Sequence, residues 1–161
     1  MNEFSLKIKS LNGNFTTQRK AKFEQAVKLV TQFFKSEEFR VWFIEQATAK
    51  KFKQLTQRQS TLTPAELYMM TQVHIELDYW IKKKPWWKRF TSVMGWTVDD
   101  DITTYADVYD GMSLAGLTAH LAHEISHLMG YSHSVEWVPA RDYSVSYLIG
   151  NWFEAKVRSV K

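Results

Sequence analysis

Cysteine is absent from the sequence. Without it no disulfide framework can form, and no thiolate can act as a metal ligand or a nucleophile. Long apolar runs are absent as well, since no stretch approaches the about 18 residues that a bilayer-crossing helix needs. Residues 1–9 alternate polar and apolar side chains and lack the continuous apolar core of a secretory signal. We therefore expect a cytoplasmic or otherwise non-exported protein that has no membrane partner and begins with a β-strand.

The length and composition favour one globular domain. A chain of 161 residues can build one substantial core but is too short for two ordinary domains. Apolar residues make up 45% of the chain and charged residues 24%, which is typical of a globular rather than a disordered protein. We expect a single domain that spans residues 1–161.

The net charge of +4 is modest, but residues 82–89 form a segment that is both cationic and aromatic. Such a segment can bind nucleic acid or an anionic surface. Alternatively, it is a solvated loop whose tryptophans, Trp86 and Trp87, fold back onto the core. Because the overall charge is mild, we favour the loop and do not expect nucleic acid as a partner.

Apolar residues at helical spacing predict helices over residues 17–34, 114–129 and 146–160. Ser113 is well placed to cap the second of these. A capping box with proline at its first helical position predicts a further short helix over residues 64–71. The chain therefore has helices both before and after its central region.

Alternating polar and apolar residues predict strands over residues 73–80, 90–98 and 102–109. The last two are separated by three aspartates, which favours a hairpin. Residues 39–44 fit either a strand or part of a helix that runs on to residue 59. Together with the helices, these strands predict an α+β protein.

Residues 123–133 spell H-E-x-x-H-x-x-G-x-x-H without a mismatch and contain three of the five histidines. On a helix, His123 and His127 project from the same face one turn apart, so both imidazoles can bind one ion. Gly130 can adopt the left-handed conformation at little cost, so the chain can turn and bring His133 to the same ion. The spacing therefore predicts a three-histidine metal site at the end of a helix.

The chemistry of these ligands favours Zn²⁺ as the cofactor. Three neutral imidazoles leave the fourth position of a tetrahedral zinc open for water, whose pKa falls toward about 7 in such sites. Glu124, beside the first ligand, can reach that water without binding the metal, as a general base must. A bare H-E-x-x-H can arise by chance on any amphipathic helix, but the full five-residue pattern is much harder to meet by chance.

Two histidines, His74 and His120, lie outside the motif. His74 falls on the polar side of its predicted strand and is expected at the surface. His120 precedes His123 by three residues, so it could approach the metal or the mouth of a cleft. For His120 we favour an ordinary, partly buried histidine over a residue that supports the metal ligands without binding the metal itself.

The motif made by His123, Glu124, His127, Gly130 and His133 resembles the zinc-binding consensus of the metzincin clan of metallopeptidases. The resemblance covers these eleven residues directly. It implies that the three histidines ligate zinc, that Glu124 acts as general base and acid, and that the substrate is a peptide bond.

The resemblance also implies a zincin-like fold, in which a twisted mixed β-sheet packs on an active-site helix and a backing helix. The N-terminal subdomain would span about residues 1–130, and a short C-terminal subdomain, about residues 131–161, would end in a helix. In this clan the strand antiparallel to the others forms the rim of the cleft and pairs with the extended substrate. That strand would lie within residues 90–98.

One part of the family pattern is missing. Metzincins place a methionine-containing turn beneath the zinc, and no methionine follows His133. Val145, or the pair at residues 138–139, can fill this apolar floor, because packing needs shape more than a sulfur atom. Several families follow the turn with a tyrosine that binds the metal or steadies the oxyanion. Aligning Val145 with the missing methionine selects Tyr147 for this role over Tyr143.

The sequence thus predicts a zinc endopeptidase with a peptide or protein as substrate. Zinc would polarise the scissile carbonyl, and Glu124 would take a proton from water and pass it to the leaving amine. Two alternatives stay open. One is a noncatalytic interaction protein that zinc stabilises, and the other is a nucleic-acid- or surface-binding module that uses residues 82–89.

Overall fold

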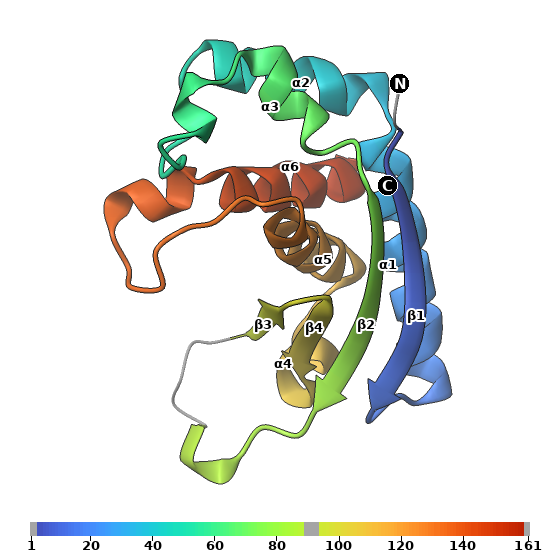
Figure 1. Ribbon diagram of the computed structural model, residues 1–161. Coiled ribbons are helices and arrows are strands. Elements are labelled where there is room, and N and C mark those ends of the chain that lie inside the picture. The colour runs from blue at the N-terminus through green and yellow to red at the C-terminus, as the bar shows by residue number, and fades with distance from the viewer. Residues whose placement is uncertain (1–2, 89–93, 160–161) are drawn as a thin grey trace.

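The computed structural model describes residues 3–88 and 94–159, which form an α+β fold (Figure 1). Within these ranges a four-stranded mixed sheet is combined with six α-helices, none of them long and apolar enough to cross a membrane. In chain order the strands and α-helices are β1 (Ser5–Gly13), α1 (Thr17–Phe34), α2 (Glu37–Thr48), α3 (Pro64–Met69), β2 (His74–Lys82), β3 (Gly95–Val98), β4 (Asp101–Tyr105), α4 (Ala106–Gly111), α5 (Leu114–Leu128) and α6 (Val145–Ser159).

The predicted α+β class is confirmed, as are most of the elements. The helices predicted over residues 17–34, 64–71 and 146–160 correspond to α1, α3 and α6. The strand predicted over residues 73–80 corresponds to β2, and the N-terminal strand, β1, lies a few residues later than expected. Helix and strand periodicity is a local property of the sequence, which is why these elements were recognisable.

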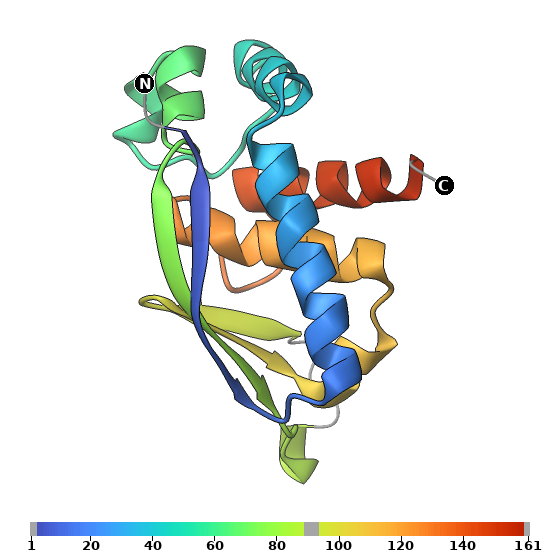
Figure 2. The same cartoon turned by 90° about the vertical axis from the view of Figure 1, so that its right-hand side faces the viewer.

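The sheet has the strand order β1-β2-β4-β3, so β1 and β3 form its edges. β1, β2 and β4 run parallel, and β3 is antiparallel to β4. Buried side chains of β2 such as Leu77 and Tyr79 face α1, where the Phe23 ring lies 4.5 Å from the Tyr79 ring. The opposite side of the sheet carries polar side chains, including the Lys7–Glu76 ion pair at 2.8 Å. The helices therefore cover one face of the sheet only (Figure 2).

The ambiguous segment at residues 39–44 is a helix, so the strand alternative is wrong. α2 starts after the N-cap Ser36, whose hydroxyl accepts a hydrogen bond from the Phe39 amide at 3.1 Å. Phe39 and Phe43 are four residues apart and both fully buried, which is the spacing of a helix face. The helix has 12 residues and does not run on to residue 59.

The hairpin predicted from the aspartate turn is confirmed, with shorter strands. Residues 90–93 of the strand predicted over residues 90–98 lie outside the described residues. β3 pairs with β4 from Gly95 onward, and the connecting turn has Asp99 in the left-handed region at φ +52°. The second strand ends at Tyr105 instead of running to residue 109. The chain then forms α4. Tyr105 and Tyr109 are buried, whereas Asp107, which would share their face in a strand, is exposed.

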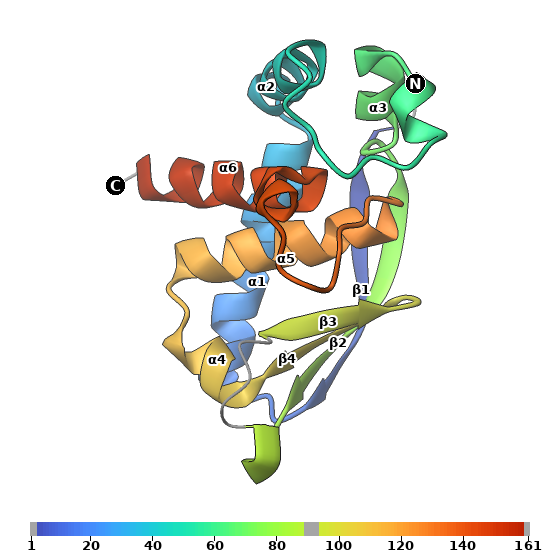
Figure 3. The ribbon, with the colours of Figure 1, turned by 90° about the vertical axis from the view of Figure 1, so that its left-hand side faces the viewer.

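α5 carries the histidine motif and lies between the edge strand β3 and α6 (Figure 3). As predicted, the Ser113 hydroxyl caps it by accepting a hydrogen bond from the Gly116 amide at 3.0 Å. α6 can approach closely because Gly150 has no side chain: a Cβ there would lie 3.2 Å from the Ala119 carbonyl oxygen. The predicted apolar stripe packs α5 into the core through Leu117, Leu121 and Ile125.

Candidate metal centre

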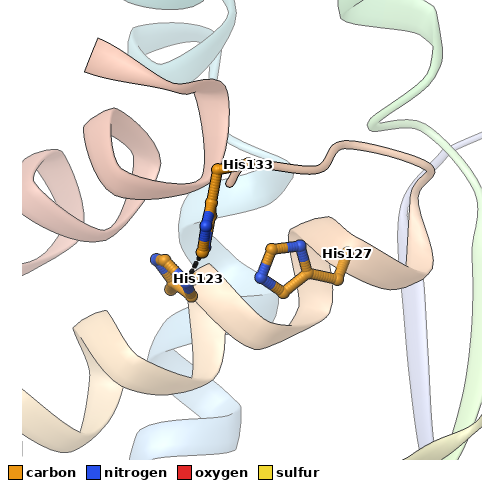
Figure 4. A group of neighbouring side chains, drawn as sticks. All are labelled: His123, His127 and His133. Atoms are coloured by element: carbon orange, nitrogen blue, oxygen red, sulfur yellow. Dashed lines mark hydrogen bonds between the residues drawn. The ribbon is translucent and has the colours of Figure 1, made fainter. Parts of the chain in front are cut away.

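Three histidines converge at the C-terminal end of α5 (Figure 4). His123 and His127 project from α5, and His133 reaches them from the loop that follows. Their ligand nitrogens all lie within 4.8 Å of one another, and the Nε2 atoms of His123 and His133 are 3.1 Å apart. Two nitrogens bound tetrahedrally to zinc at about 2.0–2.1 Å lie about 3.3 Å from each other. The three imidazoles therefore fit one zinc ion with little rearrangement.

The turn that returns His133 to the helix depends on Gly130. Its φ is +94°, a conformation that side chains with a Cβ rarely adopt. The Tyr131 amide donates to the Ser126 carbonyl at 3.1 Å, and the Gly130 amide donates to the His127 carbonyl at 3.0 Å. These two bonds make a Schellman motif, which ends α5 and reverses the chain.

Backbone carbonyls set the orientation of two of the rings. The Nδ1 atom of His127 lies 2.8 Å from the Tyr131 carbonyl oxygen, and that of His133 lies 2.9 Å from the Ser134 carbonyl oxygen. Because a carbonyl oxygen only accepts, each Nδ1 carries the proton. The lone pair of each ring is thus on Nε2, the atom that faces the common point.

Burial keeps the three imidazoles uncharged at neutral pH. Desolvation, followed by the neighbouring His127 and His133, lowers the pKa of His123 to about 2. Desolvation also lowers the pKa values of His127 and His133. Since metals bind the neutral ring, a proton does not compete for these nitrogens near pH 7.

Glu124 follows the first histidine of the cluster in the chain, and its carboxylate is bonded to the sheet. Its side chain is buried, and its Oε2 accepts a hydrogen bond from the Thr97 hydroxyl of β3 at 2.5 Å. The carboxylate is not a member of the group whose atoms converge for a metal. Glu124 is therefore a fixed carboxylate beside a candidate metal ion rather than a ligand to it. Nothing in the sequence pointed to Thr97, because 27 residues separate it from Glu124.

Tyr147 lies against the ligands, whereas Tyr143 does not. The Tyr147 ring centroid is 4.6 Å from that of His123 and 5.0 Å from that of His133. The Arg141 guanidinium covers the Tyr147 ring at 5.2 Å. Tyr143 is 55% exposed. Of the two tyrosines singled out from the sequence, the structure brings Tyr147 to the site as a packing partner of two imidazoles.

Of the residues expected to form an apolar floor under the histidines, Val145 opens α6 and is buried. Val138 is 37% exposed and is a poor candidate for that role. Next to Val145, the buried hydroxyls of Ser146 and Ser126 lie 2.6 Å apart and tie α6 to α5. No sequence signal marked this serine pair, because neither residue belongs to a recognisable motif.

The loop that follows His133 is the open side of the site. Val135 is 90% exposed and Trp137 69% exposed. The loop is anchored through Ser134, whose amide donates to the Gln54 side-chain oxygen at 3.1 Å, while the Gln54 amide donates to the Ser134 hydroxyl at 3.0 Å. Apolar side chains are therefore presented to solvent next to the candidate metal centre.

The described part of the basic and aromatic segment, residues 82–88, lies elsewhere, at the end of β2 and beyond it (Figure 1). Trp86 and Trp87 are 72% and 65% exposed, so the prediction that they fold back onto the core is wrong. They border a surface pocket of about 630 Å³ together with Lys83, Lys84, Pro85, Ala106 and Asp107.

Comparisons with known proteins found no match: no family model, curated protein or solved structure corresponds to this chain. Within residues 3–88 and 94–159, the three histidines form the one group of three or more side chains that could hold a metal ion. What the site can do is therefore argued from its own geometry.

Proposed function

We propose that the protein is a zinc-dependent endopeptidase with a zincin-like fold. The observation that carries the proposal is the convergence of three neutral imidazoles beside a buried carboxylate, Glu124, that does not join them. Three histidines suit a catalytic zinc, which keeps a coordination position open, better than a structural zinc with four protein ligands. His123, His127 and His133 would hold the ion.

When bound, zinc would supply a Lewis acid that polarises a carbonyl and lowers the pKa of a water molecule toward about 7. Glu124 takes the proton of the attacking water and passes it to the nitrogen of the leaving amine. Oε2 accepts one hydrogen bond from Thr97, and because each carboxylate oxygen has two lone pairs, the carboxylate can still take up the proton. The carboxylate needs little reorganisation for this, because its helix and β3 already hold it.

The arrangement of β3 supports an extended peptide as the substrate. β3 is an edge strand, antiparallel to β4, and it lies beside α5 (Figure 3). An extended peptide can add to such an edge through main-chain hydrogen bonds, which bind it without regard to sequence. Its scissile bond would then pass the three histidines. We propose that Tyr147 steadies the imidazoles by packing, and that its hydroxyl is available to the oxyanion.

The proposal is tested by measuring zinc content and cleavage of quenched fluorescent casein for the wild type and Glu124→Gln. The variant keeps the size of the side chain but cannot accept the proton. We expect one zinc per chain in both proteins and cleavage in the wild type only. Glu45→Gln, an exposed position on α2, is the matched control and should cleave like the wild type.

Two results would contradict the proposal. Equal cleavage by wild type and Glu124→Gln would exclude Glu124 as the general base. A wild type that holds one zinc but cleaves neither casein nor a mixed peptide library would favour the noncatalytic, zinc-stabilised alternative. Inhibition by a hydroxamate distinguishes an accessible coordination position from one that the chain itself blocks.

A second candidate function rests on the exposure of Trp86 and Trp87. Exposed tryptophans flanked by lysines can stack on the bases of single-stranded nucleic acid while the lysines neutralise phosphates. An oligo-dT should then quench tryptophan fluorescence, with an affinity that falls steeply with salt and on Trp86→Ala. Trp137→Ala is the control, because Trp137 is similarly exposed but belongs to the loop that follows His133. Binding that is weakened neither by added salt nor by Trp86→Ala would exclude this function.

A further inference from the structure

A line of buried polar side chains runs from the middle of the sheet to Glu124. The Tyr79 hydroxyl lies 2.6 Å from the Thr104 hydroxyl, which lies 2.8 Å from Nε2 of His120. Nδ1 of His120 lies 3.8 Å from Oε1 of Glu124. On its other side, Oε2 of Glu124 is bonded to Thr97. All of these side chains except Thr97 are at least nine-tenths buried.

The direction of the hydrogen bonds follows from Tyr79. Burial raises its pKa, so its hydroxyl keeps the proton. Among the described residues, Thr104 is its one hydrogen-bonding partner, so the tyrosine donates to Thr104. Thr104 then donates to Nε2 of His120, which must be unprotonated to accept. The proton of the neutral ring is therefore on Nδ1, the atom that faces Glu124.

The His120 ring is held in this orientation by the backbone of β3. A Cβ atom on Gly95 would lie 3.1 Å from both Cε1 and Nε2 of the ring, so the strand passes directly against it. Burial lowers the pKa of His120, against the opposing effect of Glu124, and keeps the ring neutral. His120 is thus an oriented dipole rather than a positive charge, and it cannot neutralise the carboxylate.

We propose that His120 is a positioning residue for Glu124, and that together with Thr97 it holds both oxygens of the carboxylate in the orientation needed for proton transfer. The inference rests on the proposed endopeptidase function. At 3.8 Å the Nδ1–H attracts the carboxylate electrostatically without forming a hydrogen bond. Such contacts often tighten when substrate binds. Tyr79 and Thr104 act through His120 by fixing its tautomer.

Three variants separate positioning from packing. His120→Leu removes both ring nitrogens, whereas His120→Asn keeps an amide N–H close to the place of Nδ1. Thr97→Val removes the other contact to Glu124 at nearly constant volume. Thr118→Val is the control, because Thr118 is buried on the same helix but its hydroxyl bonds only the Leu114 carbonyl.

The first readout is the steady-state cleavage of quenched fluorescent casein by the zinc-loaded proteins. For His120→Leu and Thr97→Val we expect kcat to fall about 10- to 100-fold, as for other partners that orient catalytic groups, with KM and zinc content unchanged. His120→Asn should recover most of kcat, and Thr118→Val should match the wild type. Equal kcat in His120→Leu and the wild type, or an equal loss in His120→Asn and His120→Leu, would overturn the proposal.

The second readout does not depend on cleavage. Cobalt replaces zinc, and the visible spectrum is recorded over a range of pH. The pH at the midpoint of the spectral change is measured, because it responds to the carboxylate beside the metal. We expect Glu124→Gln to move this midpoint, and His120→Leu and Thr97→Val to move it in the same direction by less. If only Glu124→Gln moves it, the positioning role is wrong. A wild type that shows these shifts but cleaves nothing refutes the endopeptidase proposal alone, and a protein that binds no cobalt refutes both.

Discussion

The two flanks of the metal centre are built in opposite ways. The sheet flank, made by Thr97, Thr104, His120 and Glu124, is largely buried and joined by polar contacts between β3, β4 and α5. The loop flank, residues 134–143, exposes large apolar side chains and is held to the rest of the chain at few points. A buried polar network is rigid when its members are satisfied, whereas an exposed loop tolerates change.

The contrast would separate two tasks of the proposed endopeptidase. Proton transfer requires a carboxylate held to within a fraction of an ångström, and the sheet flank provides the buried contacts that hold it. Substrate side chains vary, and exposed apolar groups such as Val135 and Trp137 can contact them without strict geometry. We therefore expect damage to the sheet flank to change stability and turnover, and damage to the loop flank to change substrate binding.

Replacing a candidate ligand should have the largest effect, because both flanks meet at the three histidines. His127→Ala leaves two imidazoles. Loss of a residue that only orients a ligand lowers metal affinity by up to about 100-fold, so loss of a ligand itself should lower zinc affinity by more. Metal content after dialysis measures this. His74→Ala, an exposed histidine on β2, is the control and should retain one zinc per chain. Retention of zinc by His127→Ala would exclude it as a ligand.

Gly95→Ala should damage the sheet flank next most strongly. The added Cβ would lie 2.4 Å from the Thr103 carbonyl oxygen and 3.1 Å from the His120 ring. Overpacking of this kind costs about 1–3 kcal/mol in the free energy of unfolding, which urea denaturation measures. Gly111→Ala is the control, since a Cβ there meets nothing within 4 Å. Equal stability of the two variants would contradict the close approach of β3 to α5.

The buried His120 should make the metal-free protein sensitive to acid. Its pKa is lowered by burial, so below about pH 6.5 the unfolded chain binds a proton that the folded chain does not. The free energy of unfolding therefore falls as the pH drops, by up to about 1.4 kcal/mol per pH unit for this one group. His120→Asn should lose less stability than the wild type between pH 7 and pH 5. Parallel pH profiles for the two proteins would show that His120 is protonated while folded.

The loop flank should show the smallest effect on stability. Trp137→Ala removes a side chain that is mostly in solvent, so the free energy of unfolding should change by less than about 0.5 kcal/mol. If this flank contacts substrate, KM rises while kcat is retained. Phe153→Ala is the contrast, because Phe153 is fully buried against Phe34 and Phe39, and its loss should cost about 3–5 kcal/mol. A large loss of stability in Trp137→Ala would mean that the loop supports the fold.

The candidate ligands, their helix and its ending were predictable because all the information is local. His123 and His127 share a helix face through a spacing of four, Ser113 marks the start of that helix, and Gly130 marks its end. The same local reasoning assigned residues 106–109 to a strand, whereas they belong to α4. Over so few residues a spacing of four fits a strand and a helix alike, and only the exposure of Asp107 between the buried Tyr105 and Tyr109 distinguishes them.

The sequence by itself determined the spacing of three histidines on and after one helix, with Glu124 beside the first of them. Only the tertiary structure decided what surrounds them: that Thr97 bonds to Glu124, that the buried His120 lies 3.8 Å from its carboxylate, and that Trp86 is exposed. The physical reason is the range of the interactions. Helical spacing repeats within one turn, whereas the contact between Thr97 and Glu124 joins residues 27 apart through the pairing of a strand edge with a helix, which no local pattern specifies.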